Sequence, residues 1–190
     1  MEKKKIFVVK KKKYIIEKIR GLPQKKVEPN KKDLIRIKED SKKFSIAKKL
    51  GVKKNFFEGK FILPSNGRIS GVFGSQRILN DKPRSPHKGL DIAAPEGTKI
   101  VAPSSGKVKL VQKDMFFTGN TIIIDHGLGL ISIFAHLKEI DVIPNQIVKK
   151  GEKIGTIGMT GRATGPHLHW GVYLQKKPVD PMVLINSSFF

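Results

Sequence analysis

Two short histidine motifs carry the strongest chemical signal in this 190-residue sequence. His167 and His169 stand two positions apart in a segment that favours a strand, and side chains at i and i+2 of a strand project from one face. Upstream, His87 and Asp91 add an imidazole and a carboxylate four positions apart. Nitrogen and oxygen donors suit zinc, which in catalytic sites usually takes three protein ligands. One histidine of the pair would complete that number, although the two histidines of a His-x-His pair can also simply be solvent-exposed polar side chains on a strand.

Three separated motifs occur in one order and spacing. They are His-x-Gly-x-Asp at 87–91, Phe-Ala-His-Leu at 134–137, and Gly-Arg-Ala-Thr-Gly-Pro-His-Leu-His-Trp at 161–170. In this arrangement, residues 67–181 closely resemble the lysostaphin/LytM-type zinc endopeptidases of bacterial cell walls. Residues 14–36 show a weaker similarity to segments that precede the catalytic domain in larger envelope members. The resemblance implies a zinc-dependent endopeptidase that hydrolyses amide bonds in the peptide cross-bridges of peptidoglycan.

The resemblance also implies a role for each histidine motif. One zinc ion is expected on His87, Asp91 and His169, with His136 and His167 beside it as catalytic groups. The sequence contains no His-Glu-x-x-His motif, whose glutamate is the base of thermolysin-like enzymes. We therefore expect histidines to take the proton from water and to stabilise the oxyanion. Which of the two catalytic histidines is the base stays open.

Other positions resemble segments that edge the cleft of the family. Arg77 could pair with a peptide carboxylate in a bidentate manner, or it could be a solvated loop arginine. Asn120 is a second expected substrate contact. The chain departs from many relatives at Gly171, where they have an acidic residue that could support the metal site. His126 is interpreted as a turn residue.

Residues 61–186 consist of short apolar runs separated by turn-forming residues. Expected strands lie at 61–63, 69–73, 99–102, 107–112, 121–125, 130–136, 153–157 and 167–174. Many short strands at this spacing predict an all-β domain. The resemblance implies that this catalytic domain has two packed antiparallel sheets with a metal-containing groove. Residues 187–190 are expected to be a tail.

Residues 1–60 are predicted to form a smaller strand and helix segment before the catalytic domain. Short strands at 6–9 and 14–19 fit a hairpin, and a linker follows it. Asn30 is suited to cap a helix that ends near Leu50 and Gly51. We expect this helix to lie on or beside the main domain, with a regulatory or tethering arm as the alternative.

The net charge of +22 is concentrated in the N-terminal segment. Of the 38 basic residues, 22 lie in residues 1–60, where there are 7 acidic ones. Such a field favours an anionic partner, such as an acidic envelope polymer or a membrane surface. The alternative is that the lysines are generic solvated surface. No nucleic-acid motif accompanies them and aromatic residues are sparse among them, so no specific nucleic acid is expected.

The sequence contains no cysteine, which excludes disulfides and thiolate ligands. No apolar run is long enough for a signal peptide or a membrane span. A peptidoglycan hydrolase must nevertheless be exported, so we expect a periplasmic or cell-envelope protein whose leader or anchor is not in this chain, with a non-standard export route as the alternative.

Two questions of function remain open at this level. The favoured target is the D-alanyl to diaminopimelate cross-link, because the N-terminal similarity is to envelope proteins of diderm bacteria, and glycyl bridges are the alternative. The second question is whether the domain is active. A catalytically silent cell-wall-binding or activator module is the alternative function, but such relatives typically lack one or more ligands, and this chain has all of them.

Overall fold

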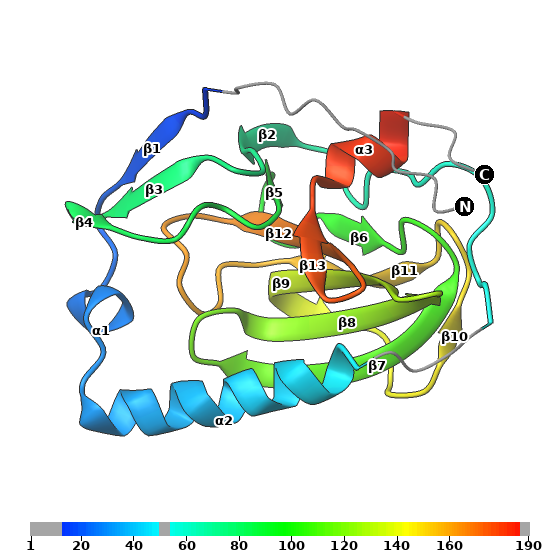
Figure 1. Ribbon diagram of the computed structural model, residues 1–190, viewed down its shortest axis with the longest axis horizontal. Coiled ribbons are helices and arrows are strands. Elements are labelled where there is room, and N and C mark those ends of the chain that lie inside the picture. The colour runs from blue at the N-terminus through cyan, green and yellow to red at the C-terminus, as the bar shows by residue number, and fades with distance from the viewer. Residues whose placement is uncertain (1–12, 50–53, 187–190) are drawn as a thin grey trace, which may run out of the picture.

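The computed structural model describes residues 13–49 and 54–186, which form two β-sheets with helices at their edges (Figure 1). The prediction of a mainly β fold with two sheets is confirmed. The helices are α1 (Gln24–Val27), α2 (Lys31–Ala47) and α3 (Pro181–Asn186). The strands are β1 (Ile16–Ile19), β2 (Arg68–Gly71), β3 (Gln76–Leu79), β4 (Lys82–Pro83), β5 (Leu90–Ala93), β6 (Lys99–Val101), β7 (Gly106–Met115), β8 (Gly119–Gly127), β9 (Leu130–Ile140), β10 (Ile147–Val148), β11 (Lys153–Ile157), β12 (His167–Leu174) and β13 (Lys177–Val179).

The larger sheet has ten strands, and β12 lies near its centre. Its main order is β10-β7-β8-β9-β12-β5-β2, while β11 pairs with β6 and β9, and β13 pairs with β12. Along β12, Leu168, Trp170 and Val172 are buried in the main core. Their neighbours His167 and His169 point to the opposite face, as the period of two requires. Because one face of β12 is buried, a one-residue slip would expose the core residues, so the register is fixed.

The smaller sheet contains β1, β3 and β4, and it pairs the N-terminal segment with residues 76–83. Strand β1 runs parallel to β3, which pairs antiparallel with β4. The expected strand at 14–19 is therefore present as β1, but its described partner is β3. The other expected hairpin strand, 6–9, lies outside the described residues. Leu22, Val27 and Leu79 form a small buried cluster that fixes this sheet and α1 together.

Helix α2 begins at its predicted cap. Asn30 Oδ1 accepts a hydrogen bond from the Asp33 amide at 2.9 Å, and the Asp33 carboxylate accepts from the Asn30 amide at 3.4 Å. This reciprocal pair satisfies two amide groups that have no partner within the helix. Phe44 and Ala47 pack on the outer face of β8 and β9, so the helix lies on the main domain, as expected. The predicted end at 50–51 lies outside the described residues.

Two local predictions are wrong. Residues 61–63 form no strand, because Phe61 donates to the Leu184 carbonyl and Ile62 to the Pro103 carbonyl, and these two acceptors lie in different segments. His126 is not a turn residue: it lies in β8 and is completely buried.

Candidate metal and catalytic site

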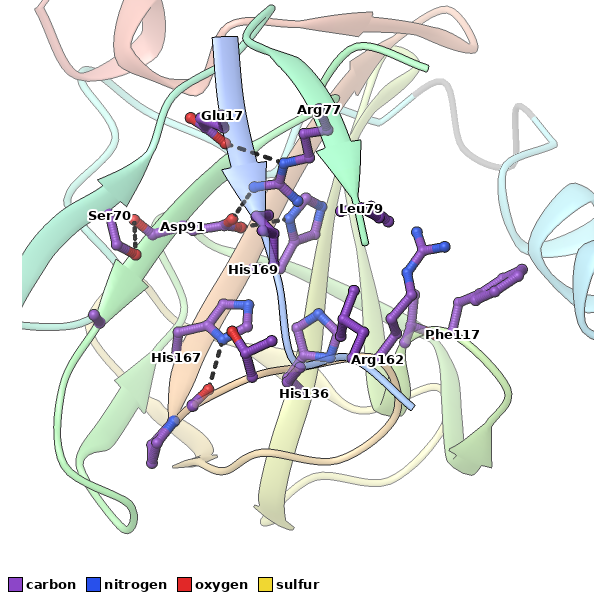
Figure 2. A pocket seen from close by; sticks show the side chains of 18 of the residues that line it. Glu17, Ser70, Arg77, Leu79, Asp91, Phe117, His136, Arg162, His167 and His169 are labelled. Atoms are coloured by element: carbon purple, nitrogen blue, oxygen red, sulfur yellow. Dashed lines mark hydrogen bonds and ion pairs between the residues drawn. The ribbon is translucent and has the colours of Figure 1, made fainter. Parts of the chain in front are cut away.

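The pairing of β5 with β12 brings three ligand-type side chains together. Asp91 stands directly opposite His169 in the antiparallel register, and His87 lies in the loop before β5. Asp91 Oδ1 is 2.8 Å from His169 Nδ1 and 3.1 Å from His87 Nε2. The two histidine nitrogens are 3.0 Å apart. These three atoms therefore form a compact cluster at one end of the groove in Figure 2, where Asp91 and His169 are labelled.

The spacing and chemistry of this cluster fit a zinc ion. Tetrahedral zinc with bonds of about 2.0–2.1 Å holds its ligand atoms roughly 3.3 Å apart, close to the separations in this chain. The His87 Nδ1 atom lies 3.0 Å from the Val72 carbonyl oxygen and carries the proton that is donated there. This bond leaves the Nε2 lone pair of His87 directed at the cluster. Two nitrogen and one oxygen donors could hold the ion and leave a fourth position open.

A guanidinium keeps the Asp91 carboxylate charged. Arg77 Nη2 donates to Asp91 Oδ2, which leaves Oδ1 facing the two histidines. Burial raises the pKa of Asp91, but hydrogen bonds from His169 and His87, together with the Arg77 charge, outweigh it and hold the pKa well below its usual value. The carboxylate is therefore ionised, as a metal ligand must be.

The sequence analysis did not identify Glu17, which supports this arrangement from β1. It stands opposite Arg77 in the parallel β1–β3 pair. Its Oε2 accepts from Arg77 Nε at 3.2 Å, and its Oε1 accepts from the Val72 amide at 3.3 Å. The one available signal was that Glu17 is the single acidic residue between positions 3 and 27. The N-terminal segment thus contributes directly to the surroundings of the metal cluster.

An irregularity in β9 turns His136 into the groove. The register with β8 shifts between Asn120 and Ile122, and His136 has a positive φ of 67°. An extra residue of this kind bends a strand and redirects a side chain. The His136 ring centroid lies 4.6 Å from that of His167 and 6.3 Å from that of His169. The bulge thus places a third imidazole beside the cluster.

The two additional histidines are oriented alike. His136 Nδ1 lies 2.8 Å from the Thr160 carbonyl oxygen, and His167 Nδ1 lies 2.9 Å from the Gly165 carbonyl oxygen. Because a carbonyl only accepts, each neutral ring carries its proton on Nδ1 and has its lone pair on Nε2. Burial, followed by the charges of His167 and His169, lowers the pKa of His136 to about 3. His136 is therefore neutral near pH 7.

The five side chains line a groove of about 540 Å³ or adjoin it. Figure 2 shows His136, His167 and His169 around this space, with Arg77 above them and Arg162 and Phe117 to the right in this view. Polar and cationic groups are prominent among its lining residues. A groove of this composition suits an extended polar chain that carries negative charge.

The two expected substrate contacts are placed differently. Arg77 lines the groove, but both Glu17 and Asp91 bind its guanidinium. The Asn120 amide accepts from the Asp114 amide at 3.1 Å and donates to the Lys138 carbonyl at 3.1 Å. Both the oxygen and the nitrogen of the Asn120 side chain are thus hydrogen-bonded to main-chain groups. Their contact with a substrate stays a prediction.

Gly171 leaves space next to His169. A Cβ atom at this position would lie 3.5 Å from His169 Nε2 and 3.4 Å from the Lys88 carbonyl oxygen, both ordinary contacts. Because His169 Nδ1 belongs to the metal cluster, the neutral ring carries its proton on Nε2. An acidic side chain at 171 would therefore be well placed to accept from it.

Comparison with known proteins supports a common origin for this arrangement. A family model described as Peptidase family M23 matches residues 85–181, which contain all five cluster and groove residues. The curated peptidoglycan DD-endopeptidase ShyB of Vibrio cholerae is 42% identical over 97 residues, which are 51% of this chain and 22% of ShyB. The chain therefore matches less than a quarter of the length of that relative.

Two solved structures have a similar fold. A zinc containing peptidase from Vibrio cholerae is 35% identical, with a TM-score of 0.62 over 66% of this chain and 40% of that one. The catalytic domain of the antimicrobial peptidase lysostaphin from Staphylococcus simulans is 29% identical, with a TM-score of 0.57 over 64% of this chain and 94% of that domain. The resemblance drawn from the three motifs is confirmed.

Proposed function

Because this chain belongs to peptidase family M23, a family of metallopeptidases, we propose that it is a zinc-dependent endopeptidase that hydrolyses amide bonds in peptidoglycan cross-bridges. One observation carries this proposal. Three atoms of the kinds that bind metals, from His87, Asp91 and His169, lie within 3.1 Å of one another beside the rings of His136 and His167. This is the combination that metal-assisted amide hydrolysis requires.

The proposed roles follow from the orientation of each group. Zinc held by His87, Asp91 and His169 would supply Lewis acidity to the scissile carbonyl and to the attacking water. His136 and His167 present Nε2 lone pairs to the same groove. One of them would take the proton of the water, and the other, once protonated, would stabilise the oxyanion or protonate the leaving amine. The two histidines are similarly oriented, so both assignments are retained.

The D-alanyl to diaminopimelate cross-link is the proposed target. Support comes from the likeness to ShyB, which is named a DD-endopeptidase. The alternative of a catalytically silent module is not favoured, because all five side chains are present and lie together. Glycyl bridges remain the competing substrate to be compared in the test.

Metal analysis tests the ligand assignment. The purified chain is expected to hold about one zinc ion, and His87→Ala or Asp91→Ala should lose it. His136→Ala and His167→Ala should retain the metal because neither residue belongs to the cluster. A wild-type protein that folds but binds no zinc would contradict the ligand assignment.

Digestion of purified sacculi tests the reaction. Mass spectrometry of the released muropeptides should detect cleavage of D-alanyl to diaminopimelate bonds in one wall type and little cleavage of glycyl bridges in another. Loss of either groove histidine should lower the rate by about a hundredfold or more, the usual contribution of general acid–base catalysis. Wild-type rates in His136→Ala or His167→Ala would contradict the role of that residue.

The proposed location is the periplasm or cell envelope, where peptidoglycan lies. No helix in the part of the chain that the structure describes is both long and apolar enough to span a membrane. The basic N-terminal segment, which includes α2, is the proposed contact with an anionic polymer or membrane surface.

A further inference from the structure

Among the groove cations that have no acidic partner in the described residues, Arg162 is partly buried, whereas Lys18 and Arg68 are exposed. Arg77 is bound by Glu17 and Asp91. The Arg162 guanidinium stacks instead on the Phe117 ring at 4.4 Å, and its Nη1 lies 3.5 Å from the Lys26 carbonyl oxygen. Within residues 13–49 and 54–186, the charges that act on its pKa are those of Arg77 and Arg84, both positive, and burial has the largest effect. The pKa falls to about 10, so the group stays charged at neutral pH.

The loop around Arg162 is held rigidly. The Arg162 amide donates to the Phe117 carbonyl at 2.8 Å. Gly161 before it has a φ of 77°, and a Cβ atom there would collide with main-chain atoms of Phe117 and Gly119. Thr160 binds His136 Nδ1 through its carbonyl oxygen. The segment that carries Arg162 therefore also orients a groove histidine, and Figure 2 shows Arg162 among the residues that line the groove with His136.

We infer that Arg162 binds a carboxylate of the substrate next to the scissile amide. This inference rests on the proposed function and specifies which substrate the groove selects. In a D-alanyl to diaminopimelate bond, the carbon attached to the amide nitrogen also carries a free carboxylate. In a glycyl bridge that carbon carries two hydrogens and the carbonyl group of the next peptide bond, so there is no free carboxylate. A partly buried, stacked guanidinium without an acidic partner favours the first substrate, because binding a carboxylate restores its charge balance.

The test compares two synthetic peptides that share one D-alanyl to diaminopimelate bond. In one peptide the carboxylate beside the scissile nitrogen is free, and in the other it is a carboxamide. The zinc-loaded wild type should have a KM at least about tenfold lower for the free carboxylate, as expected for a hydrogen bond between charged groups. Arg162→Gln should abolish this preference while changing kcat little, and Arg162→Lys should restore part of it.

Arg20→Gln is the matched control, because Arg20 is an exposed arginine that pairs with Asp81 and does not line the groove. This variant should keep the preference, and all variants should retain zinc content and thermal stability. Equal KM values for the two peptides in the wild type, or an unchanged preference in Arg162→Gln, would overturn the inference.

A binding measurement separates this inference from the proposed function. Titration calorimetry of both peptides with zinc-loaded His136→Ala, alone and combined with Arg162→Gln, compares affinities without hydrolysis. If the wild type binds the free carboxylate peptide selectively but cleaves neither peptide, the endopeptidase proposal is wrong and the role of Arg162 stands. If cleavage occurs but binding is not selective, the role of Arg162 is wrong.

Discussion

The Nε2 atom of His169 is the point at which a single substitution can most directly test the metal cluster. Groups that accept the second ring proton of a ligating histidine raise its basicity, and their removal typically weakens metal binding 10–100-fold. In this chain Gly171 provides no such group. A Cβ atom at this buried position would make ordinary van der Waals contacts, among them one of 3.5 Å with His169 Nε2.

Gly171→Glu is therefore predicted to tighten zinc binding by about tenfold, because the new carboxylate would accept from His169 Nε2 and add negative charge near the cation. Competition with a fluorescent zinc chelator measures the affinity. Gly171→Gln has nearly the same volume without the charge and should gain less. A glutamate variant that binds zinc no more tightly than the glutamine variant would contradict this geometry.

At the scale of single residues, strand alternation explains what the sequence could predict. The spacing of His167 and His169 was enough to place both on one face of β12, because the intervening Leu168 is apolar and becomes buried. The inward turn of His136 could not be predicted from alternation, since it depends on a bulge against β8. Glu17 was missed because its partner Arg77 lies 60 residues away, in a parallel pairing without a local signal.

At the scale of elements, a buried polar chain joins β8, β9 and β12 behind the groove. Trp170 Nε1 donates to Ser132 Oγ at 3.2 Å, and the Ser132 hydroxyl lies 2.8 Å from His126 Nε2. His126 Nδ1 is 2.8 Å from the Ser105 carbonyl oxygen and donates to it. Every group is satisfied only when His126 is neutral, with Nε2 as an acceptor. Burial lowers the pKa of His126 to about 4, opposed by the Ser105 bond.

This network predicts a pH dependence of folding. In the unfolded chain His126 titrates near pH 6.5, so as the pH falls from about 6.5 to about 4 the unfolded state gains a proton that the folded state does not bind. The contribution of His126 to the free energy of unfolding is therefore complete above about pH 6.5. It is lost as the pH falls to about 4, and the total loss is about 3 kcal/mol. Urea unfolding of the wild type and His126→Gln should therefore give a stability difference that shrinks across this range. A stability difference between the wild type and His126→Gln that does not change with pH would contradict this prediction.

Some strand bounds were predicted well, but the three longest strands, β7, β8 and β9, extend beyond the bounds expected for them at 107–112, 121–125 and 130–136. Strands β11 and β12 have the predicted bounds. Strands β4 and β10 have only two residues each, too few to show a period. The expected strand at 61–63 had a suitable apolar composition, but Phe61 is buried between segments without a continuous neighbouring strand. Tertiary packing, and not pairing with a neighbouring strand, determined the conformation of residues 61–63.

At the scale of the whole molecule, α2 presents a lysine-rich face to solvent. At 100° per residue, Lys31, Lys38 and Lys42 fall on one stripe of the helix, and all three are exposed. Leu34 and Ile35 flank this stripe with exposures of 54% and 64%. The opposite face packs on the main domain through Phe44 and Ala47. Figure 1 shows α2 lying along the outside of β7, so its outer face is available to a flat anionic surface.

The last prediction concerns this face. The wild type should sediment with vesicles that contain about 30% anionic lipid, and binding should fall as salt rises, because each lysine near such a surface contributes about 1 kcal/mol that is screened within a Debye length. Changing Lys31, Lys38 and Lys42 together to Gln should weaken binding by about tenfold or more. The matched control changes three exposed lysines elsewhere, Lys99, Lys149 and Lys177, which alters net charge equally. Equal losses in both triple variants would mean that net charge, and not the α2 face, attracts the protein to the surface.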